Sequence, residues 1–214
     1  MASLATAVPV TLVETGMGNV KSVARALERA GASVRTSGDP SVLAASDRLV
    51  VPGQGHFGDG ARALSGALGD ALREHIARER PYLGICLGMQ LLFESSEEAP
   101  GERGLGVLAG QVRKFAAGVR LPDGRPRKVP HMGWNLVERT NEPPETSLVG
   151  KDAWLYFVHS YHCVPGEPAL WAARAEYGEP VCAAVARGAL FACQFHPEKS
   201  GPAGARLLER WLGR

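Results

Sequence analysis

Cys86 lies in a sequence pattern that could make it a nucleophile. It is the centre of Gly84-Ile85-Cys86-Leu87-Gly88, where an apolar run over 82–86 predicts a buried strand and a helix is expected over 87–94. Such a strand-to-helix turn exposes its central side chain at the edge of a sheet, and the flanking glycines remove side chains that would clash. The helix start would favour a thiolate, and the Leu87 N–H would face an oxyanion. The alternative is a buried structural cysteine.

His196 and Glu198 could supply the base that a nucleophilic thiol needs. Residues two apart in an extended chain share a face, so Glu198 could hold one imidazole nitrogen while the other faces Cys86. The pair follows an apolar run over 189–193, which places the histidine at a strand end. A surface His-Pro-Glu turn is the alternative, but the turn at Cys86 and this pair together favour catalysis.

Gly53-Gln54-Gly55 is a third candidate element, just after a strand expected over 49–51. Glycines on both sides of Gln54 allow the peptide to turn inward or away, so its backbone N–H groups could complete an oxyanion hole. An ordinary glycine turn is the alternative.

Alternating strand and helix patterns would position these groups. Strands are predicted over 8–13, 33–36, 48–51 and 82–86, with helices over 19–30 and 61–80 between them. This order predicts an α/β fold with a mostly parallel central sheet and helices on both faces. The C-terminal half predicts antiparallel strands added to the same core, over 128–138, 154–164, 171–177, 181–187 and 189–195, and a final helix over 203–212. We expect one domain over 1–214.

Composition narrows the functional classes. The 214 residues carry 24 basic and 22 acidic side chains without a run of like charges, which argues against nucleic-acid and anionic-membrane binding. The sequence lacks the roughly 18 consecutive apolar residues of a membrane span. Four cysteines without a CxxC pair indicate a reducing, cytoplasmic setting, with Cys163, Cys182 and Cys193 as packed thiols. The histidines besides His196 show no ligand spacing with a carboxylate or thiol, so we expect no metal and no cofactor.

Several segments resemble the triad (class I) glutamine amidotransferases, and the resemblance covers essentially the whole chain. They are PGQGHF at 52–57, GICLGMQLLFE around Cys86 and FHPEKS at 195–200. Within that family, HMGWN at 131–135 and YFVHSY at 156–161 are similar to the glutaminase subunits of imidazole glycerol phosphate synthases. The resemblance implies a flavodoxin-like fold that hydrolyses glutamine through a cysteine thioester. It also implies a heterodimer partner, a cyclase of (β/α)8-barrel fold that consumes the ammonia in L-histidine biosynthesis.

The resemblance also implies roles for individual residues. Cys86 would be the nucleophile, His196 the general base and acid, and Glu198 its orienting partner. The oxyanion hole would comprise Gly53, Gln54, Gly55 and Leu87. Glutamine would be held by Gln90, Glu98, Ser160 and Tyr161, the last two through their backbone. The partner would dock on His131, Met132, Gly133, Trp134, Asn135 and Lys199. At the position of Gln54 the family has a small apolar residue, commonly valine. The bulk of Gln54 could change how the loop over 53–55 flips.

Other functions remain open on the sequence alone. The chain could serve as the glutaminase of another pathway, although HMGWN and the PGxGxF form argue against this. A stand-alone cysteine hydrolase of γ-glutamyl peptides would share the nucleophile and base but need no partner. A non-enzymatic scaffold would have no reason to keep Cys86, His196 and Glu198 together. Trp134 and Tyr156 could equally be core aromatics rather than partner contacts.

Overall fold

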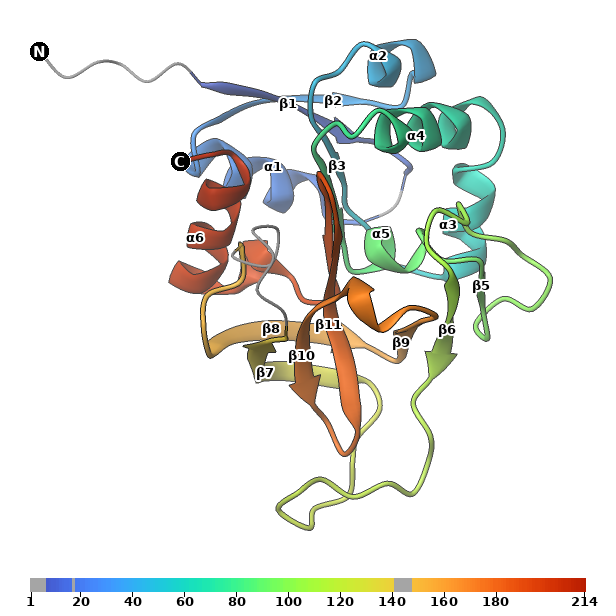
Figure 1. Ribbon diagram of the computed structural model, residues 1–214, viewed down its shortest axis with the longest axis vertical. Coiled ribbons are helices and arrows are strands. Elements are labelled where there is room, and N and C mark those ends of the chain that lie inside the picture. Colours follow the sequence, from blue (N-terminus) through green and yellow to red (C-terminus); the bar gives the residue numbers. More distant parts are fainter. Residues whose placement is uncertain (1–6, 17, 141–147) are drawn as a thin grey trace, which may run out of the picture.

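A nine-stranded mixed sheet forms the centre of the computed structural model, which describes residues 7–16, 18–140 and 148–214 (Figure 1). Its strands lie in the order β2-β1-β3-β4-β12-β11-β10-β7-β8. Parallel pairing joins β2 through β12, and antiparallel pairing joins the rest. The expected α/β architecture is therefore confirmed. The bounds are β1 Val8–Val13, β2 Ala32–Ser37, β3 Leu49–Val51, β4 Tyr82–Ile85, β7 His131–Arg139, β8 Ala153–His159, β10 Trp171–Glu176, β11 Pro180–Arg187 and β12 Leu190–Cys193.

Helices cover both faces of the parallel half of the sheet. The strands there alternate their side chains, so Val50 of β3 packs into one apolar cluster while Leu49 and Val51 pack into another. The first cluster lies under α1 and α6, which run side by side in Figure 1. The helices are α1 Val20–Arg29, α2 Pro40–Ala44, α3 Phe57–Ala63, α4 Ala67–Ala77, α5 Leu87–Gln90 and α6 Gly201–Trp211. None of the described helices has the length and apolar character to cross a bilayer.

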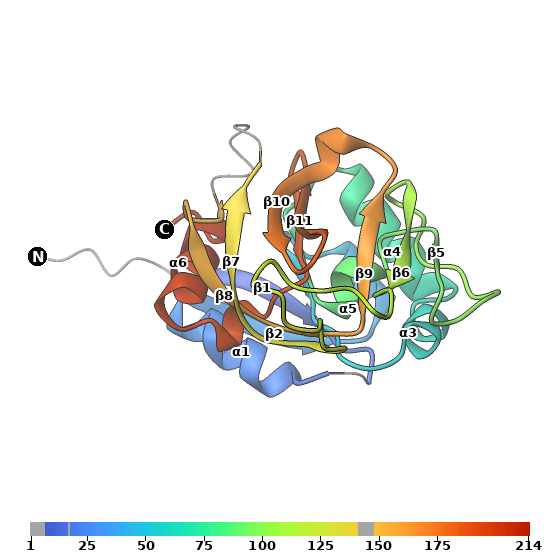
Figure 2. The same cartoon turned by 90° about the horizontal axis from the view of Figure 1, so that it is seen from below.

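A second, three-stranded sheet departs from the sequence prediction. It has the order β5-β6-β9, with β5 at Ser95–Ser96, β6 at Gly110–Lys114 and β9 at Tyr161–Pro165. The single strand predicted over 154–164 is broken at Ser160, because β8 pairs with β7 whereas β9 pairs with β6 (Figure 2). The break leaves Ser160 and Tyr161 where the two sheets meet.

Two helix predictions also needed correction. The helix predicted over 61–80 is interrupted, because Gly66 has a φ of 66° and separates α3 from α4. The helix predicted over 87–94 is one turn long, since α5 ends at Gln90. A single turn sums few peptide dipoles, so helix polarity contributes little at the start of α5.

Gly88→Ala is expected to destabilise the fold more than a glycine-to-alanine substitution at an open position. A Cβ at Gly88 would lie 2.0 Å from the carbonyl oxygen of Val51, so β3 and α5 would have to separate. The free energy of unfolding should fall by about 2 kcal/mol or more, as for overpacked cores. Urea denaturation measures this loss.

Gly150→Ala is the matched control for that substitution. The nearest atoms to a Cβ at Gly150 lie 3.9 and 4.0 Å away, which is ordinary van der Waals contact. Its unfolding free energy should stay within about 0.5 kcal/mol of the wild-type value. Equal losses from the two substitutions would refute the close packing of α5 against β3.

Candidate active site

The backbone at Cys86 is held in a strained conformation. Cys86 follows β4 and precedes α5, with a φ of 53° that non-glycine residues rarely adopt. Gly84, two residues earlier, must be glycine, because a Cβ there would lie 2.8 Å from the carbonyl oxygen of Gly88. The sharp turn places the thiol at the carboxyl edge of the parallel sheet, where α/β proteins bind their ligands. Cys86 as a whole residue is 7% exposed.

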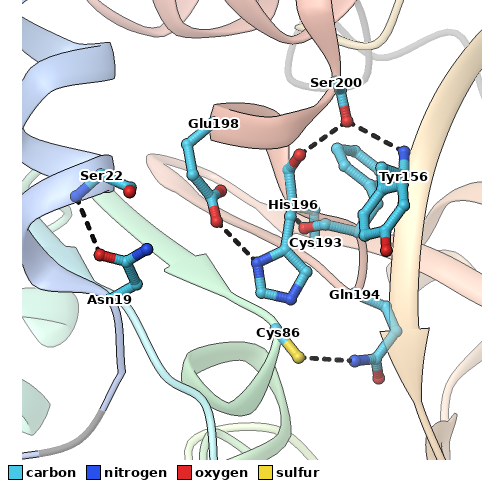
Figure 3. Close-up of polar contacts among 10 residues, drawn as sticks. Asn19, Ser22, Cys86, Tyr156, Cys193, Gln194, His196, Glu198 and Ser200 are labelled. Atoms are coloured by element: carbon cyan, nitrogen blue, oxygen red, sulfur yellow. Dashed lines mark hydrogen bonds and ion pairs between the residues drawn. The ribbon is translucent and has the colours of Figure 1, made fainter. Parts of the chain in front are cut away.

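His196 and Glu198 arrive at the same edge from β12. This strand runs parallel to β4 with Cys193 opposite Ile85, so the segment after it leaves the sheet beside Cys86. Nδ1 of His196 donates to Oε1 of Glu198 at 2.8 Å, and each side chain is 2% exposed. Figure 3 shows the imidazole between Glu198 and Cys86, with its other nitrogen directed toward the thiol.

Backbone contacts fix the position of His196. Its N–H donates to the carbonyl of Tyr156 at 2.8 Å, and its carbonyl accepts from the Ser200 hydroxyl at 2.6 Å. The same hydroxyl accepts from the N–H of Tyr156 at 3.0 Å. Strand β8 therefore anchors the backbone of His196, directly at its N–H and through Ser200 at its carbonyl, which limits displacement of the residue.

The surroundings of His196 suit proton transfer. Burial disfavours a charge on the ring, but interactions with the Cys86 sulfur and the Glu198 carboxylate outweigh it and raise the pKa of His196 to about 9. Nε2 of His196 is buried and has no hydrogen-bond partner among the described residues. The ring can therefore accept the thiol proton and hold it near neutral pH. His196, rather than the one-turn helix α5, is placed to accept a proton from Cys86.

Gln194 is a site residue that the sequence analysis did not single out. It is fully buried, and its Nε2 donates to the Cys86 sulfur at 3.5 Å. Its Oε1 accepts from Nε2 of Gln90 at 3.1 Å, and the same Gln90 nitrogen donates to the carbonyl of Tyr161 at 3.1 Å. A polar residue inside the buried run before His196 was the available signal, since buried amides need partners.

A cavity of about 450 Å³ opens beside Cys86. Nine of the residues singled out in the sequence line it, namely Gln54, Gly55, Cys86, Leu87, Gln90, Glu98, Ser160, Tyr161 and Lys199. His196, Glu198 and Gly53 are not among its lining residues. Glu98 is held by the backbone of α3, because its Oε2 accepts from the N–H of Phe57 at 2.8 Å. The dimensions suit a small polar metabolite.

The loop at 53–55 packs directly on the Cys86 turn. A Cβ at Gly53 would lie 2.6 Å from the Cβ of Leu87, so only glycine permits this approach. Gly55 has a φ of 124°, and a Cβ at this position would have no neighbour within 4 Å. The Gly55 end of this loop therefore has the freedom to reorient, whereas Gly53 is packed against Leu87.

The HMGWN strand presents two different faces. Met132 and Trp134 are 62% and 52% exposed, whereas His131 is buried and Asn135 is partly buried on the opposite face. Gly133 lies between them with a φ of 133°. The Trp134 ring packs edge-on against Tyr156 at 6.1 Å, and Lys199 Nζ lies 5.9 Å from the Tyr156 ring centre. Met132, Trp134 and Lys199 are therefore accessible to a partner, but the His131 side chain is not.

His131 and His159 are buried side by side, with Nδ1 of His131 3.0 Å from Nε2 of His159. Burial lowers the pKa of His131 to about 4 and that of His159 to about 3. Both rings are therefore neutral near pH 7. Within the described residues, no group of three or more His, Cys, Asp or Glu side chains has metal-binding geometry.

These two neutral imidazoles predict sensitivity to acid. The unfolded chain protonates them below about pH 6.5 while the folded chain does not, so the unfolded state is favoured as pH falls. The free energy of unfolding should drop by about 1.4 kcal/mol per pH unit for each ring between about pH 6 and pH 5. Urea denaturation across this range measures the slope. A slope unchanged in His131→Phe would contradict a neutral His131.

Comparisons with known proteins match nearly the whole chain. The family model described as glutamine amidotransferase class-I matches residues 11–213. The chain is 46% identical over 206 residues to the imidazole glycerol phosphate synthase subunit HisH of Methylococcus capsulatus, covering 95% of each chain. It is 49% identical over 204 residues to the same-named subunit of Deinococcus radiodurans, covering 93% of this chain and 90% of the relative.

Solved structures resemble the chain in fold. PurLQS from Thermotoga maritima aligns with a TM-score of 0.72 at 19% identity, covering 96% of this chain and 97% of the other. A structure titled as a glutamine amidotransferase aligns with a TM-score of 0.71 at 21% identity, covering 95% and 99%. At these identities the likeness shows the fold, in which Cys86 and His196 lie at the edge of the sheet.

Proposed function

This chain belongs to the class-I glutamine amidotransferase family, and from that membership we propose that it is the glutaminase subunit of an imidazole glycerol phosphate synthase. It acts in histidine biosynthesis by hydrolysing glutamine to glutamate and ammonia. The observation that carries this proposal is the Cys86 thiol, held at a strained turn and facing the buried His196–Glu198 pair beside a cavity.

The reaction begins with attack of the Cys86 sulfur on the side-chain carboxamide carbon of glutamine. His196 takes the thiol proton and gives it to the departing nitrogen, so that ammonia leaves and a γ-glutamyl thioester remains. Water then attacks the thioester with His196 as its base, and glutamate is released. Glu198 keeps Nδ1 of His196 protonated, which leaves Nε2 free to accept.

The negative charge that develops on the carboxamide oxygen needs backbone donors. The N–H of Leu87 begins α5 and has no acceptor within that helix, so it can serve as one donor. We assign the second donor to the loop of Gly53, Gln54 and Gly55, which packs on Leu87. Because these donors are backbone groups, Gln54 can fill the position through its N–H.

We assign the ammonia to a cyclase subunit of (β/α)8-barrel fold. Ammonia released into water at neutral pH is mostly protonated and cannot act as a nucleophile, so the two active sites should share a dry passage. The exposed Met132 and Trp134 and the cavity-lining Lys199 are the proposed docking face. Large exposed apolar side chains are typical of protein interfaces. The heterodimer would function in the cytoplasm as two single-domain proteins, with no cofactor in this subunit.

The glutaminase activity of the isolated chain is expected to rise when the cyclase and its ligand bind. Gly55 leaves the loop free to adopt a conformation without the second oxyanion donor, and the partner would favour the competent one. One oxyanion donor contributes roughly a hundredfold or more in rate. Glutamate release is measured for the chain alone, with the cyclase, and with the liganded cyclase.

The rival γ-glutamyl hydrolase predicts a different result in the same assay. Such an enzyme would hydrolyse γ-glutamyl peptides steadily by itself, and the cyclase would leave its rate unchanged. Equal rates of glutamate release in all three samples would overturn the proposed coupling.

A further inference from the structure

A chain of hydrogen bonds connects the inner face of β7 with the cavity beside Cys86. The Asn135 amide nitrogen lies 3.3 Å from Nε2 of His131, and Nδ1 of His131 lies 3.0 Å from Nε2 of His159. Nδ1 of His159 then lies 2.8 Å from the carbonyl oxygen of Tyr161. We call these four residues the histidine relay.

The direction of every hydrogen bond in the relay follows from its last member. A carbonyl oxygen only accepts, so Nδ1 of His159 must carry a proton. A neutral His159 then accepts at Nε2, which makes Nδ1 of His131 the donor. Nε2 of His131 accepts in turn from Asn135. Both imidazoles are therefore neutral Nδ1–H tautomers, in agreement with the burial that lowers the pKa of each ring.

One end of the histidine relay lies in the proposed glutamine site. His159 and Tyr161 both line the cavity. The Tyr161 carbonyl also accepts from Gln90 Nε2, so hydrogen bonds from two sides occupy its lone pairs. These bonds fix the backbone just after Ser160, where the main chain passes from one sheet to the other.

The remainder of the histidine relay is held rigidly. The ring of His131 stacks between the rings of Phe157 and Tyr177, with distances between ring centres of 4.6 Å and 3.8 Å. The other amide proton of Asn135 goes to the carbonyl of Glu176 in β10 at 3.0 Å. Buried hydrogen-bond chains of this kind polarise one another, and a missing member leaves its neighbour unsatisfied.

We propose that His131 and His159 are positioning residues that fix the backbone of Ser160 and Tyr161 for binding the amino-acid end of glutamine. The inference rests on the proposed glutaminase function. It places His131 inside the subunit, behind the substrate site, whereas the resemblance implied a partner contact for this residue.

His131→Phe tests the histidine relay in the complex with the cyclase. Phenylalanine keeps a ring between Phe157 and Tyr177 but removes both hydrogen bonds. We expect the KM for glutamine to rise roughly five- to tenfold, because of the two lost bonds only the one to His159 leads to the substrate site, with kcat changed by less than about twofold. In His131→Asn, an amide nitrogen can take the place of Nδ1, so the KM should return most of the way to the wild-type value.

His162→Phe is the matched control. This imidazole is also buried and stacks on Phe115 at 4.8 Å, but it lies outside the histidine relay. Its KM should remain within about twofold of the wild-type value. Urea midpoints are recorded for all variants. An unchanged KM in His131→Phe, or an equal rise in His162→Phe, would overturn the inference.

Nitrogen NMR of the full chain provides a readout that needs no turnover. Long-range proton–nitrogen correlations near pH 7 should identify His131 and His159 as Nδ1–H tautomers. An Nε2–H or protonated form of either ring would overturn the relay. If the wild-type complex releases glutamate and the KM of His131→Phe is unchanged, this inference alone is refuted. No wild-type release with the liganded cyclase refutes the proposed function, and the inference with it.

Discussion

Cys86→Ala is expected to abolish glutamine-dependent product formation by the complex while ammonia-dependent formation continues. The strained turn presents one sulfur to the cavity, and alanine offers no atom that can form the thioester. Removal of a nucleophile that works together with its base costs at least about a thousandfold in rate. Glutamate release and cyclase product are measured on the same sample, first with glutamine and then with ammonia.

Cys182→Ala is the control for that experiment. Cys182 is fully buried in β11, where its thiol donates to the carbonyl of Ala184 at 3.5 Å, and burial raises its pKa. This variant should keep the wild-type rate of glutamate release. Glutamate release by Cys86→Ala at the normal rate would show that the nucleophile has been assigned wrongly.

Glu198→Gln is expected to lower kcat by about a hundredfold to ten thousandfold, with little change in KM. The carboxylate accepts the Nδ1 proton of His196 and so leaves Nε2 able to take the thiol proton. A carboxamide can instead donate to Nδ1, which forces the proton onto Nε2 and blocks the base. The substitution also removes the negative charge of Glu198 that helps to raise the pKa of His196.

Steady-state kinetics over a range of pH measures both effects. Glu167→Gln is the control, because this substitution makes the same chemical change away from the site. Glu167 is exposed and precedes β10 in the chain. Its kcat should equal that of the wild type. A Glu198→Gln variant with full kcat would exclude Glu198 as the orienting partner of His196.

The sequence predicted the parts of the site that depend on local backbone chemistry. The glycines around Cys86 and the spacing of His196 and Glu198 are constraints within five residues, and the structure has the strained turn and the ion pair at those places. The parallel order of the first strands followed from the alternation of strand and helix. These features need no knowledge of distant contacts.

The junction at Ser160 could not be read in the same way. Residues 154–164 have the apolar pattern of one strand. The first half pairs with β7 and the second half with β6, so the two halves belong to different sheets. Gln194 was overlooked for a related reason, since its partners Cys86 and Gln90 lie more than 100 residues earlier in the chain.

The two faces of HMGWN could have been predicted from the sequence. Alternate residues of a strand point to opposite sides, so His131 and Asn135 share one face while Met132 and Trp134 share the other. The resemblance grouped all five as partner contacts. The pairing of His131 with His159 required the register of β7 on β8, which only the folded chain supplies.

Active-site labelling tests the central claim, that Cys86 is the nucleophile of a glutaminase, most directly. The complex with the liganded cyclase is treated with a glutamine analogue that carries a diazoketone in place of the carboxamide, and its peptides are mapped by mass. We predict one label per chain, on Cys86, which appears in step with the loss of glutamate release and is prevented by glutamine. Label on Cys163, Cys182 or Cys193, or full glutamate release by a chain labelled at Cys86, would contradict the claim.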